Sequence, residues 1–323
     1  MQGKDMPVSD AMSAVYVGVD VCKDWLDVHV HPQGLRLRVG NDRLGLRRLK
    51  KTLAGLSVAR VVMEATGKYH RAAQRSLHAA GLAVAVVDPR RARLLAQAIG
   101  QHAKTDAIDA RFLATMGAMV DPPAREPPPR LIEHLAELVA ARRAATADRT
   151  ALSNRLTATT IAFLRTELRR MRASTERHIR RLDAAIAQLV ESDPDLARRH
   201  AILCSIPGIG TVTAATFLAG LSELGQASAK QLAMLVGVAP IANDSGDRTG
   251  QRKVRGGRRA VRDAAYMAAL SASRYNPALA SFAARLKAAG KPAKLVLVAV
   301  MRKLVVLANT LIAGNRLWTP NPP

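Results

Sequence analysis

Apolar residues in the first part of the chain follow the periods of short strands and amphipathic helices. Runs that alternate apolar and polar residues indicate strands, whereas apolar positions three or four residues apart indicate helices. These patterns predict three strands joined by hairpins, followed by helix, strand, helix, strand and helix. The predicted elements are strands 14–21, 26–30 and 35–39, helix 44–56, strand 58–63, helix 69–80, strand 82–87, and helical residues 89–119 with a break near Gly100.

This order of elements is typical of the ribonuclease-H-like fold, so residues 13–120 are predicted to form an α/β domain of that class. Right-handed crossovers would return each later strand parallel to the first. The fourth strand can then lie beside the first, with both carboxyl ends at one edge of the sheet. Because ligands of open α/β sheets bind at that edge, we expect the functional residues of this domain at the ends of these two strands.

The rest of the chain is predicted to be mainly helical. Residues 121–129 are rich in proline and indicate a stiff linker at a domain boundary. Residues 130–193 contain no glycine or proline and keep a helical stripe of Leu and Ile, which predicts a long helical hairpin or coiled coil. Residues 200–318 form a second compact domain, in which 206–210 is either a helix-hairpin-helix-like element or a plain helix connector. The apolar run 295–312 contains two basic residues and predicts a buried helix, not a membrane span.

The charge of the chain narrows the classes of function. Lys and Arg number 49 against 25 Asp and Glu, a net charge of +24, which indicates a polyanionic partner and above all nucleic acid. Because the basic residues are spread along the chain, a membrane partner is disfavoured. Aromatic residues are only 3%, so phosphate contacts by Arg should dominate over base stacking. With no signal-peptide pattern and no disulfide framework, we expect a soluble cytoplasmic protein.

Four carboxylates form the main candidate site. Asp20 ends the first strand, Glu64 ends the fourth, and Asp106 and Asp109 share one face of a helix because they are three residues apart. Each alone has an ordinary interpretation as a turn, surface or helix-start residue. Together, at topologically matched places, they favour a site for hard cations such as Mg²⁺ (or Mn²⁺), which suits phosphoryl transfer.

A second candidate site lies in the polar, glycine-rich loop 242–257. Ser245 there has the ordinary interpretation of a turn residue. As a nucleophile it would need a base or a metal to take its proton, and the local sequence holds no His. The basic residues that follow are either a solvated face or nucleic-acid contacts, and the glycines among them favour the contacts. These residues are Arg248, Arg252, Lys253, Arg255, Arg258, Arg259 and Arg262.

Together these motifs resemble the DEDD-type transposases of a family of bacterial insertion sequences. Three segments are similar to the acidic motifs of its N-terminal, RuvC-like domain, and four are similar to its C-terminal transposase domain. The resemblance covers most of the chain except the first dozen residues. The acidic segments are 18–23, 64–67 and 104–109, and the C-terminal segments are 206–210, 235–240, 245–246 and 255–258.

The resemblance implies an RNA-guided recombinase of a mobile element, in which a structured non-coding (bridge) RNA pairs with donor and target DNA. Ser245 matches the family serine that forms a covalent phosphoserine. The carboxylates with Mg²⁺ or Mn²⁺ would complete the site across protomers of a homo-oligomer, from dimer to tetramer, in a cytoplasmic, nucleoid-associated protein. The sequence departs from expectation at Cys22, where a small polar residue is expected, and at Asp244 and Asp247, which add negative charge beside Ser245.

Two other functions stay open at this point. A metal-dependent, junction-resolving nuclease would share the carboxylates and need no serine. A non-enzymatic nucleic-acid-binding protein would use the acidic residues only structurally. Formation of a covalent DNA adduct that depends on Ser245 separates the recombinase from both.

Overall fold

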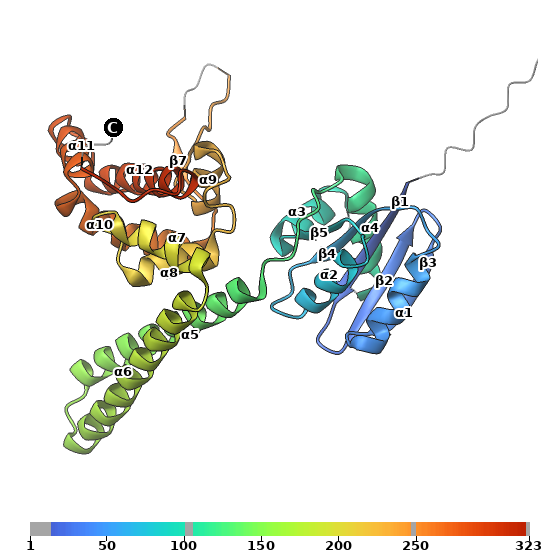
Figure 1. Cartoon of the computed structure of the whole chain (residues 1–323), viewed down its shortest axis with the longest axis horizontal. Helices are drawn as coiled ribbons and strands as arrows, with labels where there is room; N and C mark the ends of the chain where they lie inside the picture. Colours follow the sequence, from blue (N-terminus) through green and yellow to red (C-terminus); the bar gives the residue numbers. More distant parts are fainter. Residues whose placement is uncertain (1–13, 101–105, 247–249, 321–323) are drawn as a thin grey trace, which may run out of the picture. The chain divides into compact units, whose positions relative to one another are not determined.

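The computed structural model in Figure 1 describes residues 14–100, 106–246 and 250–320, except for the side chains of residues 106–108. The chain divides into two compact units, Met1–Pro127 and Pro128–Pro323. The first unit therefore ends within the proline-rich segment that the sequence marked as a domain boundary.

The first unit contains a five-stranded sheet in the order β3-β2-β1-β4-β5. Strands β1, β2 and β3 pair antiparallel, whereas β4 pairs parallel with both β1 and β5. This mixed topology agrees with the prediction of a ribonuclease-H-like order. The elements are β1 (Val15–Val21), β2 (Trp25–His31), β3 (Leu35–Gly40), α1 (Arg43–Leu53), β4 (Val58–Glu64), α2 (His70–His78), β5 (Val84–Val87), α3 (Pro89–Ala98) and α4 (Asp106–Val120).

Helices cover both faces of this sheet (Figure 1). The odd-numbered valines of β1 pack with the apolar stripes of α1 and α2. On the other face, α4 lies so close to β1 that a Cβ on Gly18 would meet the carbonyl oxygen of Ala110 at 2.0 Å. A Cβ on Gly117 of α4 would likewise meet the ring of Tyr16 at 2.9 Å. Two glycines thus allow the close approach that brings α4 onto the strand carrying Asp20.

The linker segment after α4 lies along the open edge of β5. The guanidinium of Arg60 donates two hydrogen bonds, of 2.9 and 3.0 Å, to the carboxylate of Asp121, and these contacts lower the pKa of Asp121. Farther along, the backbone N–H of Arg125 donates to the carbonyl of Val84 at 2.9 Å. The predicted linker is therefore bound to the first unit over much of its length.

The second unit begins with the predicted helical hairpin, α5 (Arg130–Ala158) and α6 (Ala162–Glu191). Its base belongs to the core of the C-terminal helices, because Leu135, Ile186 and Val190 are buried in that cluster. An ion pair between Arg142 and Asp183 joins the two helices. The structure thus confirms both helices and groups them with the C-terminal part.

The remaining elements of the second unit surround one apolar core. Gly208 lies in the turn between α7 and α8 and has a positive φ of 107°. A side chain would not fit there, because the backbone of Ala272 is in contact with Gly208. The elements are α7 (Pro194–Ser205), α8 (Thr211–Gly220), α9 (Ala229–Val236), β6 (Pro240–Ile241), β7 (Lys253–Val254), α10 (Arg259–Tyr275), α11 (Pro277–Ala288) and α12 (Ala293–Ala313).

Helix α12 is long and apolar enough to cross a membrane by length and composition alone. One of its faces is nevertheless buried in the core of the second unit, through Val296, Val300, Leu304 and Leu311. The prediction of a buried helix is therefore confirmed, since this is how the central helix of a globular unit packs.

Candidate active site

Two of the predicted carboxylates lie at adjacent strand ends. Val19 of β1 pairs with Met63 of β4, and Asp20 and Glu64 are the next residues along these two strands. Side chains alternate along a strand, so Asp20 shares the face of Gly18, which α4 covers. Both carboxylates are half-buried. The predicted meeting of these strand ends is therefore what the structure shows.

Helix α4 carries Asp109 to the same face. Asp109 is half-buried and immediately precedes Ala110, whose carbonyl oxygen lies against Gly18. Asp106 is the first residue of α4, but its side chain lies outside the described part of the chain. Because α4 packs closely on β1 at Gly18, Asp109 lies on the part of α4 that is nearest to Asp20 along the strand.

The types of these donors fit a hard divalent cation, which prefers carboxylate oxygen. Among the residues that the structure describes, however, no three His, Cys, Asp or Glu side chains form a group that could hold a metal ion. Metal binding by the four carboxylates therefore stays a prediction.

A charged row beside these carboxylates was not predicted from the sequence. Asp20 pairs across the sheet with Asp27 of β2, which pairs in turn with Arg38 of β3. Arg38 donates two hydrogen bonds of 2.8 Å, one to each carboxylate oxygen of Asp27, and its guanidinium lies 5.2 Å from the ring centre of Trp25. Directly opposed residues share one face of a sheet, so Glu64, Asp20, Asp27 and Arg38 form one transverse row.

The next row toward the centre of the sheet contains a buried histidine. His29 pairs with Gly18 and is only 6% exposed. Burial is the main cause that lowers its pKa, and the nearby guanidinium groups of Arg36 and Arg111 add to the effect. The ring is therefore uncharged at neutral pH, so it adds no positive charge under α4.

Ser245 lies in a loop at the end of a short hairpin formed by β6 and β7. Its side chain is exposed, and the next residue, Gly246, has a positive φ of 53°. The carboxylate of Asp244 accepts a hydrogen bond of 3.0 Å from the backbone N–H of Gly250, which closes the loop. Asp244 thus has a structural role within the loop, whereas Asp247 lies outside the described residues.

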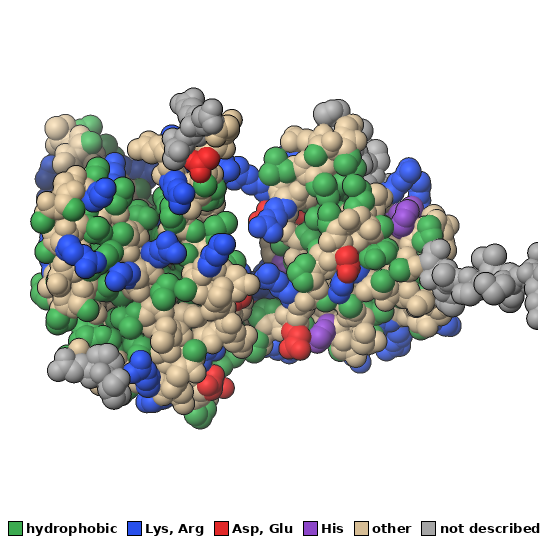
Figure 2. Space-filling view, turned by 90° about the horizontal axis from the view of Figure 1, so that it is seen from above, with side chains coloured by type: hydrophobic (Ala, Val, Ile, Leu, Met, Phe, Trp, Pro, Cys, Tyr) green, Lys and Arg blue, Asp and Glu red, His purple; other side chains and the backbone are tan. Residues whose placement is uncertain are grey.

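The predicted nucleic-acid-binding residues fall into two groups. Arg252, Lys253, Arg255 and Arg259 are exposed, and the visible face in Figure 2 shows many more Lys and Arg side chains than Asp and Glu. Arg258 and Arg262 are half-buried and bind within the unit: Arg262 donates to the carbonyl of Gly256. Arg248 lies outside the described residues. Contact with nucleic acid stays a prediction. It is favoured most for the four basic residues whose side chains are exposed.

Arg258 anchors the base of the loop. Its guanidinium donates to the two carboxylate oxygens of Glu223 at 2.6 and 2.7 Å and to the carbonyl of Gly220 at 2.8 Å. Burial of Glu223 opposes ionisation, but the hydrogen bonds and charge of Arg258 outweigh it and lower the pKa of Glu223 to about 2. Glu223, which the sequence did not single out, therefore fixes the end of the loop that carries Ser245.

Comparison with known proteins gives two family matches on this chain. A transposase model of the DEDD type typified by IS110 matches residues 17–164, which include all four carboxylates. A second model, described as transposase of the IS116/IS110/IS902 family, matches residues 200–284, which include Ser245 and the basic loop.

Individual relatives agree with these matches. The pilin gene-inverting proteins of Moraxella bovis and Moraxella lacunata are each 29% identical over 320 residues, spanning 94% of this chain and 98% of the relative. An uncharacterized protein of insertion element IS116 from Streptomyces clavuligerus is 34% identical over 128 residues, which are 39% of this chain and 32% of that protein. The chain therefore carries the two transposase domains of the IS110/IS116 family, and it is an enzyme of the transposase and site-specific recombinase class.

Proposed function

We propose that this enzyme breaks and rejoins DNA through a covalent phosphoserine at Ser245, with a RuvC-like carboxylate site that serves the same reaction. The observation that carries the proposal is the position of Ser245. It is exposed in a loop closed by Asp244 and Gly250 and followed by exposed basic residues. Such residues hold a DNA backbone by its phosphates, which would bring a phosphorus atom to the serine hydroxyl.

The chemistry needs no external energy source. The Oγ of Ser245 attacks the phosphorus, an ester bond forms, and the bond from phosphorus to a sugar oxygen breaks. The leaving sugar hydroxyl takes up a proton equivalent to the one that the serine loses. Attack by a sugar hydroxyl on the phosphoserine reverses these steps, so the DNA strand is resealed and the serine is regenerated.

Asp20, Glu64, Asp106 and Asp109 are the residues that would hold Mg²⁺ or Mn²⁺. When bound, such a cation would neutralise charge on the phosphate and favour loss of the serine proton. The adjacent strand ends of Asp20 and Glu64 support this assignment. No His lies near Ser245 in sequence, which leaves the carboxylate site as the candidate source of activation.

The structured guide RNA and the homo-oligomer are further parts of this proposal, and both come from the family resemblance. The net charge of +24 supports the binding of more than one polyanion. Sequencing of RNA that copurifies with the chain would show one structured species encoded beside its gene. A random mixture of cellular RNA would contradict the proposal that the chain binds a structured guide RNA.

The experiment that tests the serine step is an adduct trap. The full chain is incubated with Mg²⁺, copurified RNA and a DNA fragment that contains its own gene and flanks, and then denatured. We expect a DNA-linked band that requires Ser245 and persists in Ser174→Ala, a matched change at an exposed serine of α6 in the second unit. Cleavage without an adduct, unaffected by Ser245→Ala, would refute the proposal and favour the nuclease.

The names of the full-length relatives suggest inversion as the outcome of strand exchange. The same phosphoserine chemistry serves inversion or insertion, since only the arrangement of the DNA sites differs. A plasmid that carries the element flanks in inverted or direct orientation distinguishes them. Inverted products would assign inversion to this chain, and products at new sites would assign transposition.

A further inference from the structure

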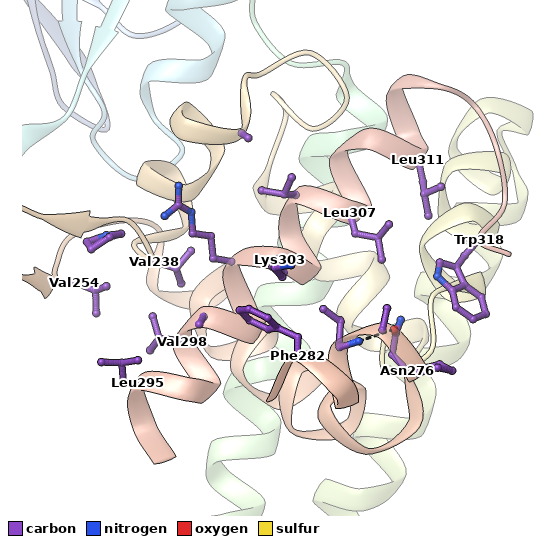
Figure 3. A pocket seen from close by; sticks show the side chains of 18 of the residues that line it. Val238, Val254, Asn276, Phe282, Leu295, Val298, Lys303, Leu307, Leu311 and Trp318 are labelled. Atoms are coloured by element: carbon purple, nitrogen blue, oxygen red, sulfur yellow. Dashed lines mark hydrogen bonds between the residues drawn. The ribbon is translucent and has the colours of Figure 1, made fainter. Parts of the chain in front are cut away.

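A large apolar pocket lies in the second unit, at the base of the hairpin that carries Ser245. Its volume is about 1120 Å³, slightly above the ~300–1,000 Å³ of ordinary ligand sites. Strands β6 and β7, helices α11 and α12 and the segment 316–320 contribute to its wall. In Figure 3, Val254, Leu295, Val298 and Phe282 line one part of the hollow and Trp318 another.

The charges around this pocket have one sign. Within the described residues, five basic side chains belong to its lining and no Asp or Glu does. An apolar floor with a basic rim is complementary to an anion that also has flat apolar surfaces. The five basic residues are Arg252, Lys294, Arg302, Lys303 and Arg316.

We propose that this pocket binds an unpaired stretch of the DNA substrate, with bases on the apolar floor and phosphates at the basic rim. Arg252, in the loop that carries Ser245, and Val254, in β7, are both part of the pocket. A strand held by that loop therefore has a place for its neighbouring nucleotides. The proposal rests on DNA as the substrate and does not require Ser245 to be the nucleophile.

The apolar floor favours an unpaired strand over the other candidates. A duplex presents phosphates outward and keeps the faces of its bases in the stack, so it cannot cover this surface. A second copy at this face would have to present an acidic patch to the five basic residues, whereas Lys and Arg outnumber Asp and Glu by 49 to 25 in the chain. Of the polyanions proposed as partners of this chain, an unpaired nucleotide stretch combines exposed apolar base faces with negative charge.

Trp318 is the ring best placed to stack on such a base. Its backbone N–H donates to the hydroxyl of Ser205 at 2.9 Å, and Arg198 holds the preceding turn through two hydrogen bonds to Asn315. The ring of Phe282, by contrast, already lies 4.2 Å from the ammonium of Lys303. The segment that carries Trp318 is thus fixed before any ligand binds, which lowers the entropy cost of stacking.

The test uses the two tryptophans of the chain, Trp25 and Trp318. In the full-length Trp25→Phe variant, Trp318 is the sole tryptophan. Its emission is measured during titration with a 20-nucleotide single-stranded DNA, the matching duplex and the matching RNA. We expect saturable quenching by the single-stranded DNA and little quenching by the duplex at equal salt.

Two charge-matched variants locate the binding. Leu295 lines the pocket and is 50% exposed, whereas Leu164 of α6 is 43% exposed and outside the pocket lining, so Glu at either position should leave the fold intact. Leu295→Glu should weaken binding of single-stranded DNA at least fivefold, the lower limit for loss of one stacked base at about 1 kcal/mol. Leu164→Glu should change it little.

Three results would overturn the proposal. Equal effects of Leu295→Glu and Leu164→Glu would place the binding outside the pocket. Quenching by RNA but not by DNA would assign the pocket to RNA. Emission that changes with protein concentration alone, together with self-association in ultracentrifugation, would assign it to a second copy. The proposed serine chemistry is unaffected by these outcomes, because its adduct trap is read separately.

Discussion

Replacement of Glu223 by Gln removes one charge from the ion pair at the base of the Ser245 loop. Glutamine keeps the shape of the side chain and one of its hydrogen-bond acceptors. The guanidinium of Arg258 would remain 35% exposed, with only the Gly220 carbonyl and the new amide as partners. A partly buried charge that loses its counter-charge destabilises the folded unit.

The pKa of Glu223 sets the size and direction of this effect. Its fall from 4.5 to about 2 corresponds to roughly 3 kcal/mol of folding free energy. Residual solvent access to both side chains screens part of that, so we expect about 2 kcal/mol. Because the folded-state pKa is lowered, this stabilisation is complete above pH 4.5 and disappears as the pH falls toward 2.

Urea unfolding in the Trp25→Phe background measures this effect, because Trp318 then reports on the second unit. The Glu223→Gln variant should be about 2 kcal/mol less stable at pH 7, and the difference should vanish near pH 2. Glu167→Gln is the control, since Glu167 pairs with Arg170 at the surface of α6 and should cost at most ~0.5 kcal/mol. A Glu223→Gln difference that is independent of pH would refute the reasoning.

Three further predictions concern the first unit. Urea or thermal unfolding checks each in the Trp318→Phe background, where Trp25 is the sole tryptophan. Gly18→Ala should destabilise it by about 3 kcal/mol, because the new methyl lies 2.0 Å from the Ala110 carbonyl; an unchanged midpoint would show that α4 can move. Arg38→Met should cost about 2 kcal/mol, since Asp27 is 8% exposed but the Arg38 side chain is itself 55% exposed, and Arg38→Lys should recover part. Mn²⁺ at a hundredfold excess over its Kd should add about 2.7 kcal/mol, and Asp20→Asn should abolish that gain if the carboxylates bind the ion.

The sequence predicted the parts of the site that depend on local pattern. Asp20 and Glu64 follow apolar strand runs, and parallel strands from right-handed crossovers end at one edge. Their adjacency could therefore be predicted. The helix break near Gly100 could also be predicted, because a glycine marks it within the local sequence. The structure has α3 end at Ala98 and α4 begin at Asp106.

Contacts between distant residues were not predictable. The Asp27–Arg38 pair depends on the exact register of two hairpins, which a shift of one residue would destroy. Arg258 looked like a phosphate contact because its neighbours are basic, but its partner Glu223 lies 35 residues earlier. The apolar stripe of α5 predicted that Leu135 is buried without identifying the C-terminal core as its partner. The pocket combines residues from Ala229 to Pro320, which no local pattern unites.

The segment between Asp121 and Pro127 has a practical consequence for dissecting the enzyme. Residue Val84 belongs to β5, an edge strand whose outward backbone groups could pair with another chain. The N–H of Arg125 occupies one of those groups, and the Arg60–Asp121 pair keeps the segment in place. A fragment cut after Val120 would expose this edge and should aggregate, whereas one that ends at Pro127 keeps it covered. The linker segment therefore also covers the edge strand of the sheet.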